Sequence, residues 1–407
     1  MARLVQKFGG TSVGDPDRIR DVADYVARCH RRGDEIVLVV SAMGKETDDL
    51  LRIASEVSST RPGREMDMLI TAGERKAIAL VCMALADLGV EAESYTGSQA
   101  GFITDTNHTD AKILEVRADR IAAALAAGRV PVVAGAQGVS TDHDVTFLGR
   151  GGSDTTAVAL AKALGADFCE LYTDVSGVFT TDPRVVPEAR KMSTISFDEL
   201  LEMTATGCPK PAMRSVEYAV RHGVKLHVRS AFTWEPGTLV VEEDPNMEQA
   251  TVRAITHDLS EAKVTVSGVP DQPGVAAKLF RALADRGVNV DMIVQNASAD
   301  GITDISFTVP HSDVAASMDV VSALQPELGI REFGADPTVA RVSVIGAGMK
   351  SNPGIAASMF ECLAEHGINI DMISTSAIRI SCVVSQDQAE QAVAVLHSTY
   401  ELDKSDY

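Results

Sequence analysis

Residues 5–15 read VQKFGGTSVGD, an apolar strand-like run that ends in a glycine-rich loop. Lys7 stands near the end of the run, and the backbone amides of Gly9, Gly10 and Thr11 follow in the turn. A lysine beside several loop amides suits a phosphate group, although the spacing differs from that of the Walker lysine loop. Gly-Gly turns are also common without any ligand. The stretch therefore predicts a strand and a turn and leaves the ligand open.

The rest of the N-terminal part alternates short β-rich runs with amphipathic helical ones. The expected strands include residues 35–40, 130–136, 168–173 and 224–230, and the expected helices include 17–28, 74–88 and 154–164. Such alternation is typical of an α/β domain, in which a largely parallel sheet carries helices on both faces. Ligands of such domains bind at the carboxyl ends of the strands, and Lys7 with its glycine loop is expected at such an end.

Residues 147–156, FLGRGGSDTT, stand directly before one of the expected helices. One interpretation is local: Ser153 is the N-cap, Asp154 interacts with the helix dipole, and the glycines form a turn. The other interpretation is functional: the amides and Arg150 receive an anionic ligand, while Asp154 holds a positive group. The stretch taken alone favours capping, and only the rest of the chain decides between the two.

The C-terminal part contains an internal repeat. Residues 271–293 realign on residues 351–373 at an offset of 80, with 12 identities in 23 positions. A strand at 263–268 or 341–346 precedes each copy, a proline and a glycine follow, and then comes a helix with one apolar face, which in the first copy carries Leu279, Phe280 and Leu283. We expect two copies of one small module after a domain boundary at 242–249. Modules that serve stability alone are the alternative to ligand-binding ones.

Composition excludes several classes of function. The chain has 407 residues, 45% of them hydrophobic, and a formal net charge of −20, which argues against nucleic acid as a partner. No apolar stretch approaches the roughly 20 residues of a membrane span, and Met1 leads directly into a strand-like run, so we expect a cytoplasmic protein without a membrane partner. The six cysteines form no CxxC pair and are expected to be mostly buried thiols.

Three further stretches complete a specific set: VSAMGKETDDLL at 40–51, TAGERKAIAL at 71–80, and YTDVSGVFTTDPRVVPEAR at 172–190. Together with the loop at 5–15 and LGRGGSDTTAVALAKAL, in this order and spacing, they resemble the aspartate kinases of the amino-acid-kinase family. The resemblance spans essentially the whole chain, and the repeated module resembles the paired ACT domains of those enzymes. The capping-only interpretation of residues 147–156 therefore becomes the minor one.

The resemblance implies a fold and a domain order. The fold is α/β, an amino-acid-kinase domain with a mainly parallel sheet and helices on both faces, followed by two ferredoxin-like βαββαβ ACT modules. The kinase domain would span residues 1–245 and the first ACT domain 263–336. The second ACT domain would be assembled from 246–262 and 337–407, so that the first is inserted in it.

The implied reaction is the phosphorylation of L-aspartate by ATP, with Mg²⁺, to 4-phospho-L-aspartate, the first step of lysine, threonine and methionine synthesis. A carboxylate nucleophile is already an anion at pH 7 and needs no general base. The protein must bring two anions together and stabilise charge on the transferred phosphoryl group. A site of lysine, arginine, glycine amides and acids, without a histidine or serine dyad, suits this chemistry.

The resemblance also assigns roles to residues. Lys7 would contact the ATP phosphates, Arg150 would pair with an aspartate carboxylate in a bidentate fork, and Glu74 and Asp154 would receive the ammonium group. Lys7, Arg150 and Asp154 are the predicted catalytic residues. The predicted substrate-binding set is Ser41, Thr47, Glu74, Arg150, Gly151, Gly152, Ser153 and Asp154. The predicted nucleotide-binding set is Lys7, Phe8, Gly9, Gly10, Thr173, Asp174, Phe179, Arg184 and Lys210. No protein metal ligand is predicted, because Mg²⁺ would bridge the β- and γ-phosphates.

The paired ACT modules imply regulation by amino acids, with lysine and threonine as the expected effectors. The matching positions are Asp271, Gly274, Ala276 and Gln295 in the first module and Asn369 and Ile370 in the second. Small modules need partner surface, so a homo-oligomer of two chains or more is expected. Some relatives start a shorter regulatory subunit within the same gene, and Met247 stands where such a subunit would begin.

The chain departs from the family pattern near both substrates. Pro209 stands where the family usually has a lysine, and Lys210 follows it, before a second proline. We expect Lys210 to replace that lysine. Ala77, Ile78 and Ala136 are further departures near the expected acceptor site. They leave two alternatives open: a kinase for a different amino-acid carboxylate in a specialised pathway, and a weakly catalytic amino-acid-binding regulatory protein.

Overall fold

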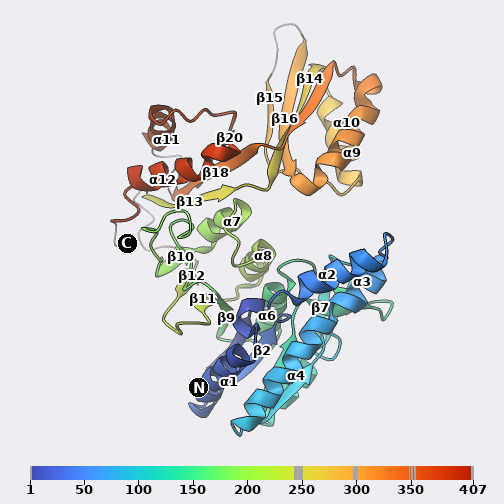
Figure 1. Cartoon of the computed structure of the whole chain (residues 1–407), viewed down its shortest axis with the longest axis vertical. Helices are drawn as coiled ribbons and strands as arrows, with labels where there is room; N and C mark the ends of the chain where they lie inside the picture. The colour runs from blue at the N-terminus through green and yellow to red at the C-terminus, as the bar shows by residue number, and fades with distance from the viewer. Residues whose placement is uncertain are drawn as a thin grey trace. The chain divides into compact units, whose positions relative to one another are not determined.

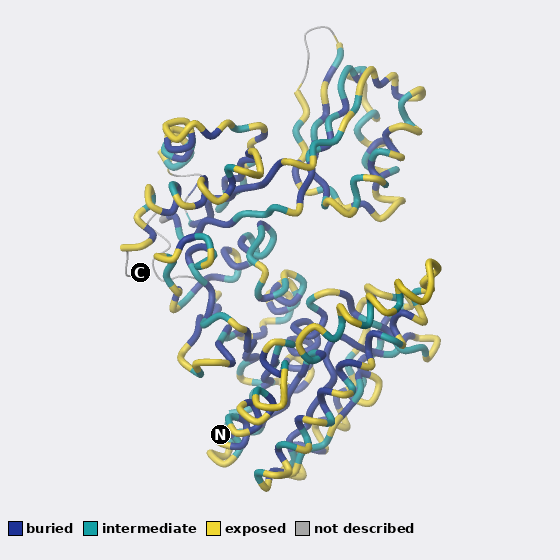
Figure 2. The backbone as a smooth tube through the Cα atoms, viewed as in Figure 1, coloured by how far each residue is buried: buried dark blue, intermediate teal, exposed yellow. Residues whose placement is uncertain are grey.

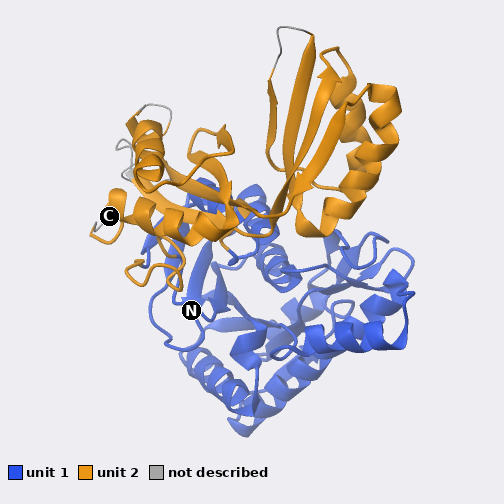
Figure 3. Ribbon diagram, turned by 45° about the horizontal axis from the view of Figure 1, so that its top comes forward, with its two compact units in different colours: residues 1–178, 191–204, 209–245 blue, residues 179–190, 205–208, 246–407 orange. Residues whose placement is uncertain are grey.

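A computed structural model describes residues 2–242, 251–296, 301–347, 349, 352 and 354–404. The chain forms two compact units (Figure 3). The first comprises residues 1–178, 191–204 and 209–245, and the second comprises 179–190, 205–208 and 246–407. Two short segments of the N-terminal part thus belong to the second unit. The boundary expected at 242–249 and the proposed start at Met247 lie, except for residue 242, outside the described residues.

An eight-stranded sheet forms the centre of the first unit (Figure 1). Its strands lie in the order β10 (Thr194–Ser196), β12 (Thr238–Val241), β11 (Leu226–Ser230), β9 (Phe168–Thr173), β1 (Arg3–Phe8), β2 (Glu35–Val40), β6 (Val130–Ala134) and β3 (Ala92–Tyr95). All neighbours are parallel except β11 and β12. The predicted α/β fold is confirmed, and the carboxyl ends of β1, β2, β6 and β9 lie along one edge.

Helices cover both faces of this sheet. On one face, α1 (Pro16–Arg31) and α4 (Ala72–Asp87) pack against alternate residues of β2, namely Ile36, Leu38 and Val40. On the other face lies α6 (Gly152–Leu164), of which eleven of the thirteen residues are buried, with α8 (Met213–His222) against it. The central strands are buried along most of their length (Figure 2).

The period of two along β1 decides where its side chains go. Phe8 enters the cluster with α1 and α4 and stacks on Tyr172, with ring centroids 4.7 Å apart. Lys7 is the next residue back along the strand and therefore points to the opposite face, where α6 lies. The alternation of one short strand thus separates a core aromatic from a cation at the strand end.

The remaining elements of the first unit form a side layer and connections. A second sheet has the order β5 (Ile113–Val116), β4 (Phe102–Thr104), β7 (Gln137–Ser140) and β8 (Val145–Phe147). The other helices are the 3-10 helix η1 (Gly10–Val13), α2 (Glu46–Val57), α3 (Gly63–Ile70), α5 (Asp119–Ala126) and α7 (Phe197–Ala205).

The second unit contains two antiparallel four-stranded sheets with two long helices each. The first copy of the repeat orders its strands as β15 (Ile293–Asn296), β16 (Ile302–Pro310), β14 (Glu261–Pro270) and β17 (Glu332–Asp336), with α9 (Val275–Asp285) and α10 (Val314–Leu328). The second orders them as β13 (Thr251–Asp258), β18 (Val339–Ala347), β20 (Arg379–Ser385) and β19 (Met372–Thr375), with α11 (Gly354–Glu365) and α12 (Ala389–Thr399). Leu279 and Leu283 are buried in the first core, as their spacing predicts. β13 precedes the first copy in sequence but pairs with β18 of the second.

The repeated aspartate of the two modules makes reciprocal contacts. Asp291 of the first module pairs with Arg341 on β18 of the second. The equivalent Asp371 of the second module lies 2.5 Å from the Nζ of Lys263, on β14 of the first. Arg341 is only 1% exposed and also lies 2.8 Å from Glu261. The first module therefore supplies two acids, Asp291 and Glu261, and the base Lys263 to the contact, and the second module supplies Arg341 and Asp371.

Candidate active site

A buried ion pair joins β1 to the start of α6. The Nζ of Lys7 lies 2.6 Å from Oδ1 of Asp154, and the two side chains are 12% and 9% exposed. The other carboxylate oxygen, Oδ2, accepts a hydrogen bond of 3.0 Å from the backbone N–H of Ala212. Two predicted catalytic residues are thus in direct contact. The positive group that Asp154 holds here is the Lys7 ammonium, rather than the substrate ammonium expected from the resemblance.

The capping interpretation of residues 147–156 is wrong in its details. α6 begins at Gly152, its N-cap is Gly151, and no side-chain hydrogen bond caps it within the described chain. Gly151 has φ of 75°, a conformation that favours glycine, and a Cβ there would lie 2.5 Å from the Cβ of Ala212. Ser153 lies inside the first turn, 7% exposed, and packs against Gly135. Because glycine has no side chain, the N-cap offers no side-chain acceptor to the first backbone amides of α6, and Ser153 does not supply one either.

The glycine loop after β1 packs closely on the loop after β2. The N–H of Ser41 donates to the carbonyl of Phe8 at 3.1 Å, and the N–H of Gly44 donates to the carbonyl of Gly10 at 2.9 Å. A Cβ on Gly10 would lie 2.8 Å from the carbonyl oxygen of Ala42, so only glycine allows this approach. A Cβ on Gly9 would lie 3.5 Å from the Nζ of Lys7. The structure therefore brings Gly9, Gly10, Ser41 and Lys7 to one place.

Glu74 is a buried carboxyl group beside this loop pair. It lies in the first turn of α4, is 3% exposed, and accepts hydrogen bonds from its own backbone amide and that of Ala42. Burial raises its pKa to about 7, against the opposing effect of these amides. Its Oε2 has no hydrogen-bond partner in the part of the chain that the structure describes. Thr47, in the first turn of α2, is partly buried.

The other predicted acceptor residues differ in exposure. Arg150 is exposed at the tip of the loop between β8 and α6, whereas Gly152 is buried against Ala136 and Leu148. The departures Ala77 and Ile78 lie in the apolar core between α1 and α4, where they supply packing and no polar group. Ala136 is buried at φ of 58° and sits against the start of α6.

Lys210 contacts the end of β9. Its Nζ lies 2.6 Å from Oδ1 of Asp174, with the two side chains 40% and 45% exposed. Partial burial opposes ionisation of Asp174, but the hydrogen bond and the charge of Lys210, together with bonds from its own backbone and from Thr173, outweigh burial and lower the pKa of that carboxyl group. Thr173 also donates to Asp174, at 3.1 Å. The lysine between the two prolines therefore does reach a predicted nucleotide residue; the Lys210–Pro211 peptide is cis.

Two predicted nucleotide residues belong to the second unit. Phe179 and Arg184 lie in its segment 179–190, and Arg184 pairs with Asp182 at 2.6 Å. The same segment is bonded to the second module through Thr180, whose carbonyl accepts from the N–H of Ile255 at 2.8 Å and whose hydroxyl lies 3.0 Å from His397. The structure thus brings Thr173, Asp174 and Lys210 together within the first unit, whereas Phe179 and Arg184 belong to the second unit.

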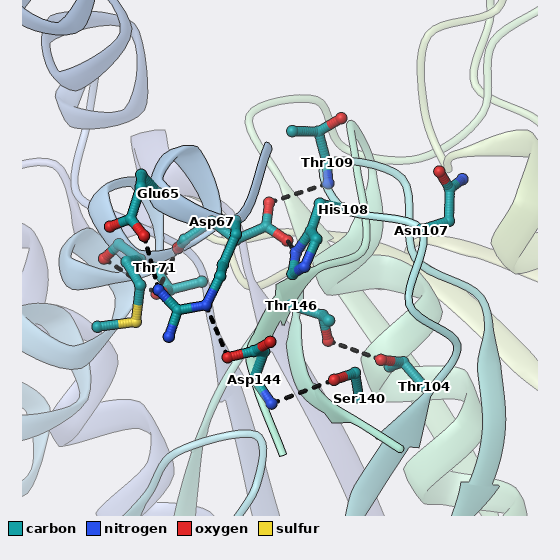
Figure 4. Close-up of polar contacts among 12 residues, drawn as sticks. Glu65, Asp67, Thr71, Thr104, Asn107, His108, Thr109, Ser140, Asp144 and Thr146 are labelled. Carbon is teal, nitrogen blue, oxygen red and sulfur yellow. Dashed lines mark hydrogen bonds and ion pairs between the residues drawn. The ribbon is translucent and has the colours of Figure 1, made fainter. Parts of the chain in front are cut away.

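One polar cluster beside the site was missed by sequence reasoning (Figure 4). Asp67 of α3 is fully buried, and its carboxylate lies 2.7 Å from Nδ1 of His108 and accepts the N–H of Thr109 at 2.9 Å. The hydroxyl groups of Thr104 and Thr146 lie 2.7 Å apart nearby. This cluster fixes the loop after β4 on α3. An acid in an apolar helix pattern and a His-Thr pair 41 residues later are too ordinary to predict such a contact.

The predicted effector positions lie on the surface of the second unit. Asp271, Gly274, Gln295 and Asn369 are exposed, and Ala276 and Ile370 are partly buried. Gly274 is the N-cap of α9, with φ of 98°. The six free cysteines are buried or partly buried, as predicted.

Comparisons with known proteins agree with this architecture. Residues 2–230 match the amino acid kinase family, and residues 263–324 and 342–400 match the ACT domain. The aspartokinase of Mycolicibacterium smegmatis is 53% identical, covering 100% of this chain and 98% of its own. The aspartokinase of Corynebacterium glutamicum is 49% identical over the same shares.

Solved structures extend the comparison. Aspartate kinase from Synechocystis shares 44% identity and a TM-score of 0.55, covering 99% of this chain and 70% of its own. E. coli aspartokinase III, in complex with aspartate and ADP, has a TM-score of 0.85 at 24% identity, covering 97% and 99%, and supports the fold. Fold and sequence together define a small-molecule kinase with a pair of ACT domains. The chain belongs to the aspartokinase family.

No helix in the described ranges is long and apolar enough to cross a membrane.

Proposed function

We propose that this chain transfers the γ-phosphoryl group of ATP to the β-carboxylate of L-aspartate. The observation that carries the proposal is the grouping, at one sheet edge, of the Lys7–Asp154 pair with the buried carboxyl group of Glu74. A carboxylate oxygen of aspartate attacks the γ-phosphorus, the bond to the β,γ-bridging oxygen breaks, and ADP leaves. No proton has to be removed from the nucleophile.

The contacts of Asp154 and Glu74 support different roles for the two acids. Asp154 holds Lys7 in place at the end of β1, where the ammonium can stabilise charge on the transferred phosphoryl group. Glu74 has an oxygen without a partner and a raised pKa, so it is the better receiver for the substrate ammonium. Arg150, exposed at the loop tip, would bind a substrate carboxylate as a fork, with Ser41, Thr47 and the Gly151–Ser153 backbone around it.

On the nucleotide side, we assign Thr173, Asp174 and Lys210 to ATP, with Phe8, Gly9 and Gly10 near the phosphates. Phe179 and Arg184 remain predicted contacts from the neighbouring segment. Mg²⁺ fits as an ion carried by the nucleotide: among the described residues no group of three His, Cys, Asp or Glu could hold a metal. Its ligands would be phosphate oxygens and water, with at most one or two carboxylates such as Asp174, and it would neutralise phosphate charge.

Regulation by amino acids is part of the same proposal. The two ACT domains carry Asp271, Gly274, Ala276, Gln295, Asn369 and Ile370 as candidate effector positions. E. coli aspartokinase III has been solved with lysine and aspartate and shares 25% identity and a TM-score of 0.72 with this chain. We propose lysine and threonine as effectors and a homo-oligomer of at least two chains. Whether a shorter subunit starts at Met247 stays a prediction.

A coupled ADP-release assay with a panel of acceptors tests the proposal. L-Aspartate should support turnover, N-acetyl-L-aspartate should fail because it lacks the ammonium group, and L-glutamate should be poor. Turnover with another amino acid, and not aspartate, would establish the alternative kinase. Absence of turnover with every acceptor, combined with thermal stabilisation by lysine or threonine, would establish the regulatory protein instead.

A further inference from the structure

Arg214 is a fork between two backbone segments of the first unit. It lies in the first turn of α8, with its side chain 27% exposed. One terminal nitrogen, NH1, donates to the carbonyl of Leu148 at 2.7 Å, and the other, NH2, donates to the carbonyl of Ala111 at 2.8 Å. NH1 also lies 3.5 Å from the carboxylate of Asp110. One guanidinium thus holds two carbonyls from distant parts of the sequence.

Both carbonyls border the loop that carries Arg150. Leu148 directly precedes Gly149, and its own N–H donates to Ala136 at 2.8 Å, so both polar groups of this buried residue are fixed. The N–H of Ala111 donates to Phe147 at 2.9 Å. A Cβ on Gly149 would lie 2.9 Å from Oδ1 of Asp110, so the loop starts in close contact with the segment 110–111. Arg214 therefore holds the stem of the loop from which Arg150 projects.

The same helix start also holds the far end of that loop. The N–H of Ala212 donates to Asp154, and Gly151 lies against Ala212. Two residues earlier, Lys210 contacts Asp174 on the nucleotide side. The segment 210–214 consequently touches both ends of the acceptor loop and one predicted nucleotide residue, all within the first unit.

We propose that Arg214 is a positioning residue for the aspartate subsite. It fixes the carbonyl of Leu148, and through it the loop that presents Arg150, without contacting the substrate itself. Lysine cannot take over this role fully, because a single ammonium lacks the two separated donors of the guanidinium plane. The inference rests on the proposed aspartate kinase activity and adds a determinant of its acceptor side.

The test compares Arg214→Met and Arg214→Lys with Arg221→Met, a matched change at an exposed arginine of the same helix. Arg214→Met should raise the KM for aspartate at least tenfold and leave the KM for ATP within twofold. Arg214→Lys should fall between parent and Arg214→Met, and Arg221→Met should match the parent. A general structural defect would instead move both KM values or lower kcat alone, and either result overturns the proposal.

Two further readouts keep the test decisive. If Arg214→Met does not fold, Arg214→Lys carries the test: an aspartate KM at least threefold above the parent supports the role, and an unchanged value overturns it. Hydrogen exchange in a peptide covering residues 147–154 should be faster in Arg214→Lys than in the parent, and equal protection overturns the proposed path through Leu148. Failure of the parent itself to use aspartate would refute the proposed function, a result that the variants cannot mimic.

Discussion

Two helices begin at the same sheet edge with an acid in the first turn, and the two acids have different partners. Asp154 at the start of α6 has a cation 2.6 Å away and a backbone amide on its other oxygen. Glu74 at the start of α4 is equally buried, accepts hydrogen bonds from backbone amides, and keeps one oxygen without a partner among the described residues. The charge of Arg75 lowers the pKa of Glu74 less than burial raises it. Burial raises its pKa to about 7.

The difference indicates that Asp154 has a structural role, because it holds Lys7, and that Glu74 is available to bind a ligand. A buried carboxylate with a cation contributes to a stable arrangement, and removing one partner strands the other. A buried carboxyl group without a cation makes the folded protein less stable when it ionises. A bound ammonium group would offset this loss of stability. We propose that Glu74 binds such a group, the ammonium of the substrate.

The largest effect is expected from removal of Lys7, because Asp154 then becomes a second buried acid without a cation in contact with it. Lys7→Ala should lower kcat with aspartate and ATP at least a hundredfold, about 3 kcal/mol in the barrier, since it removes a charge from the phosphoryl path. Steady-state ADP release measures this. Lys162→Ala, an exposed lysine on α6, is the control and should match the parent. Near-normal kcat in Lys7→Ala would refute the assignment of the phosphoryl site.

Neutral substitutions should have opposite effects on stability at the two acids. Asp154→Asn should lower the free energy of unfolding by about 3 kcal/mol at pH 8, because it leaves the buried Lys7 uncompensated. Glu74→Gln should not lower it, and at pH 8 should raise it by up to about 3 kcal/mol. The folded pKa of Glu74 lies above its unfolded value, so the ionised carboxylate destabilises the fold above pH 7 and not below about pH 4.5. Urea titrations at pH 8 and pH 5 measure both, and equal losses in the two variants would remove the distinction.

The affinity for aspartate should depend on pH in the same way as the ionisation of Glu74. The ammonium group binds the carboxylate form, so the Kd for aspartate should rise about tenfold from pH 8 to pH 6 for a group with a pKa of about 7. Calorimetric titration at a series of pH values measures this slope. Glu74→Gln should bind weakly with a flat profile, whereas Asp154→Asn, if folded, should keep the slope. A flat profile in the parent would show that another group receives the ammonium.

The smallest expected effect concerns the half-exposed pair on the nucleotide side. Lys210→Ala should raise the KM for ATP about tenfold, or 1.4 kcal/mol, and leave the KM for aspartate little changed. Stability should change little, because an ion pair this exposed contributes about 0–1 kcal/mol. Lys225→Ala, an exposed lysine nearby in sequence, is the control. An unchanged KM for ATP would mean that Lys210 makes no contact with the nucleotide that contributes to binding.

Periodicity predicted the elements of the fold well, and the motifs named candidate site residues whose contacts with one another they did not predict. The strand at 35–40 has the predicted bounds, because five consecutive apolar residues between polar flanks leave little choice of structure. The start of α6 was misjudged, because Ser153 is a good N-cap by type, while Gly151 takes that position through its left-handed backbone. Lys7 and Asp154 were assigned to different ligands, and their direct contact depends on which face of β1 meets α6.

The contacts of Arg214 and Asp67 could not be predicted from the sequence. Both act on backbone groups or on residues far away in sequence, and a carbonyl oxygen has no residue type that a pattern could reveal. The domain boundaries at 245, 263 and 336 stay predictions. The membership of 179–190 and 205–208 in the second unit could not be foreseen, because both segments lie inside the kinase motifs.

The position of β13 sets an order of events during synthesis on the ribosome. β13 leaves the ribosome before the first module, yet its partner β18 begins only after that module is complete. Roughly 80 residues separate the two strands, which at about 5–20 residues per second is a delay of roughly 4–16 s. Throughout that interval the nascent chain carries an unpaired strand whose N–H and C=O groups invite pairing with other chains. The first module can fold while β13 is still unpaired, so the sheet that is completed last contains the first strand of this unit to be translated after residue 250.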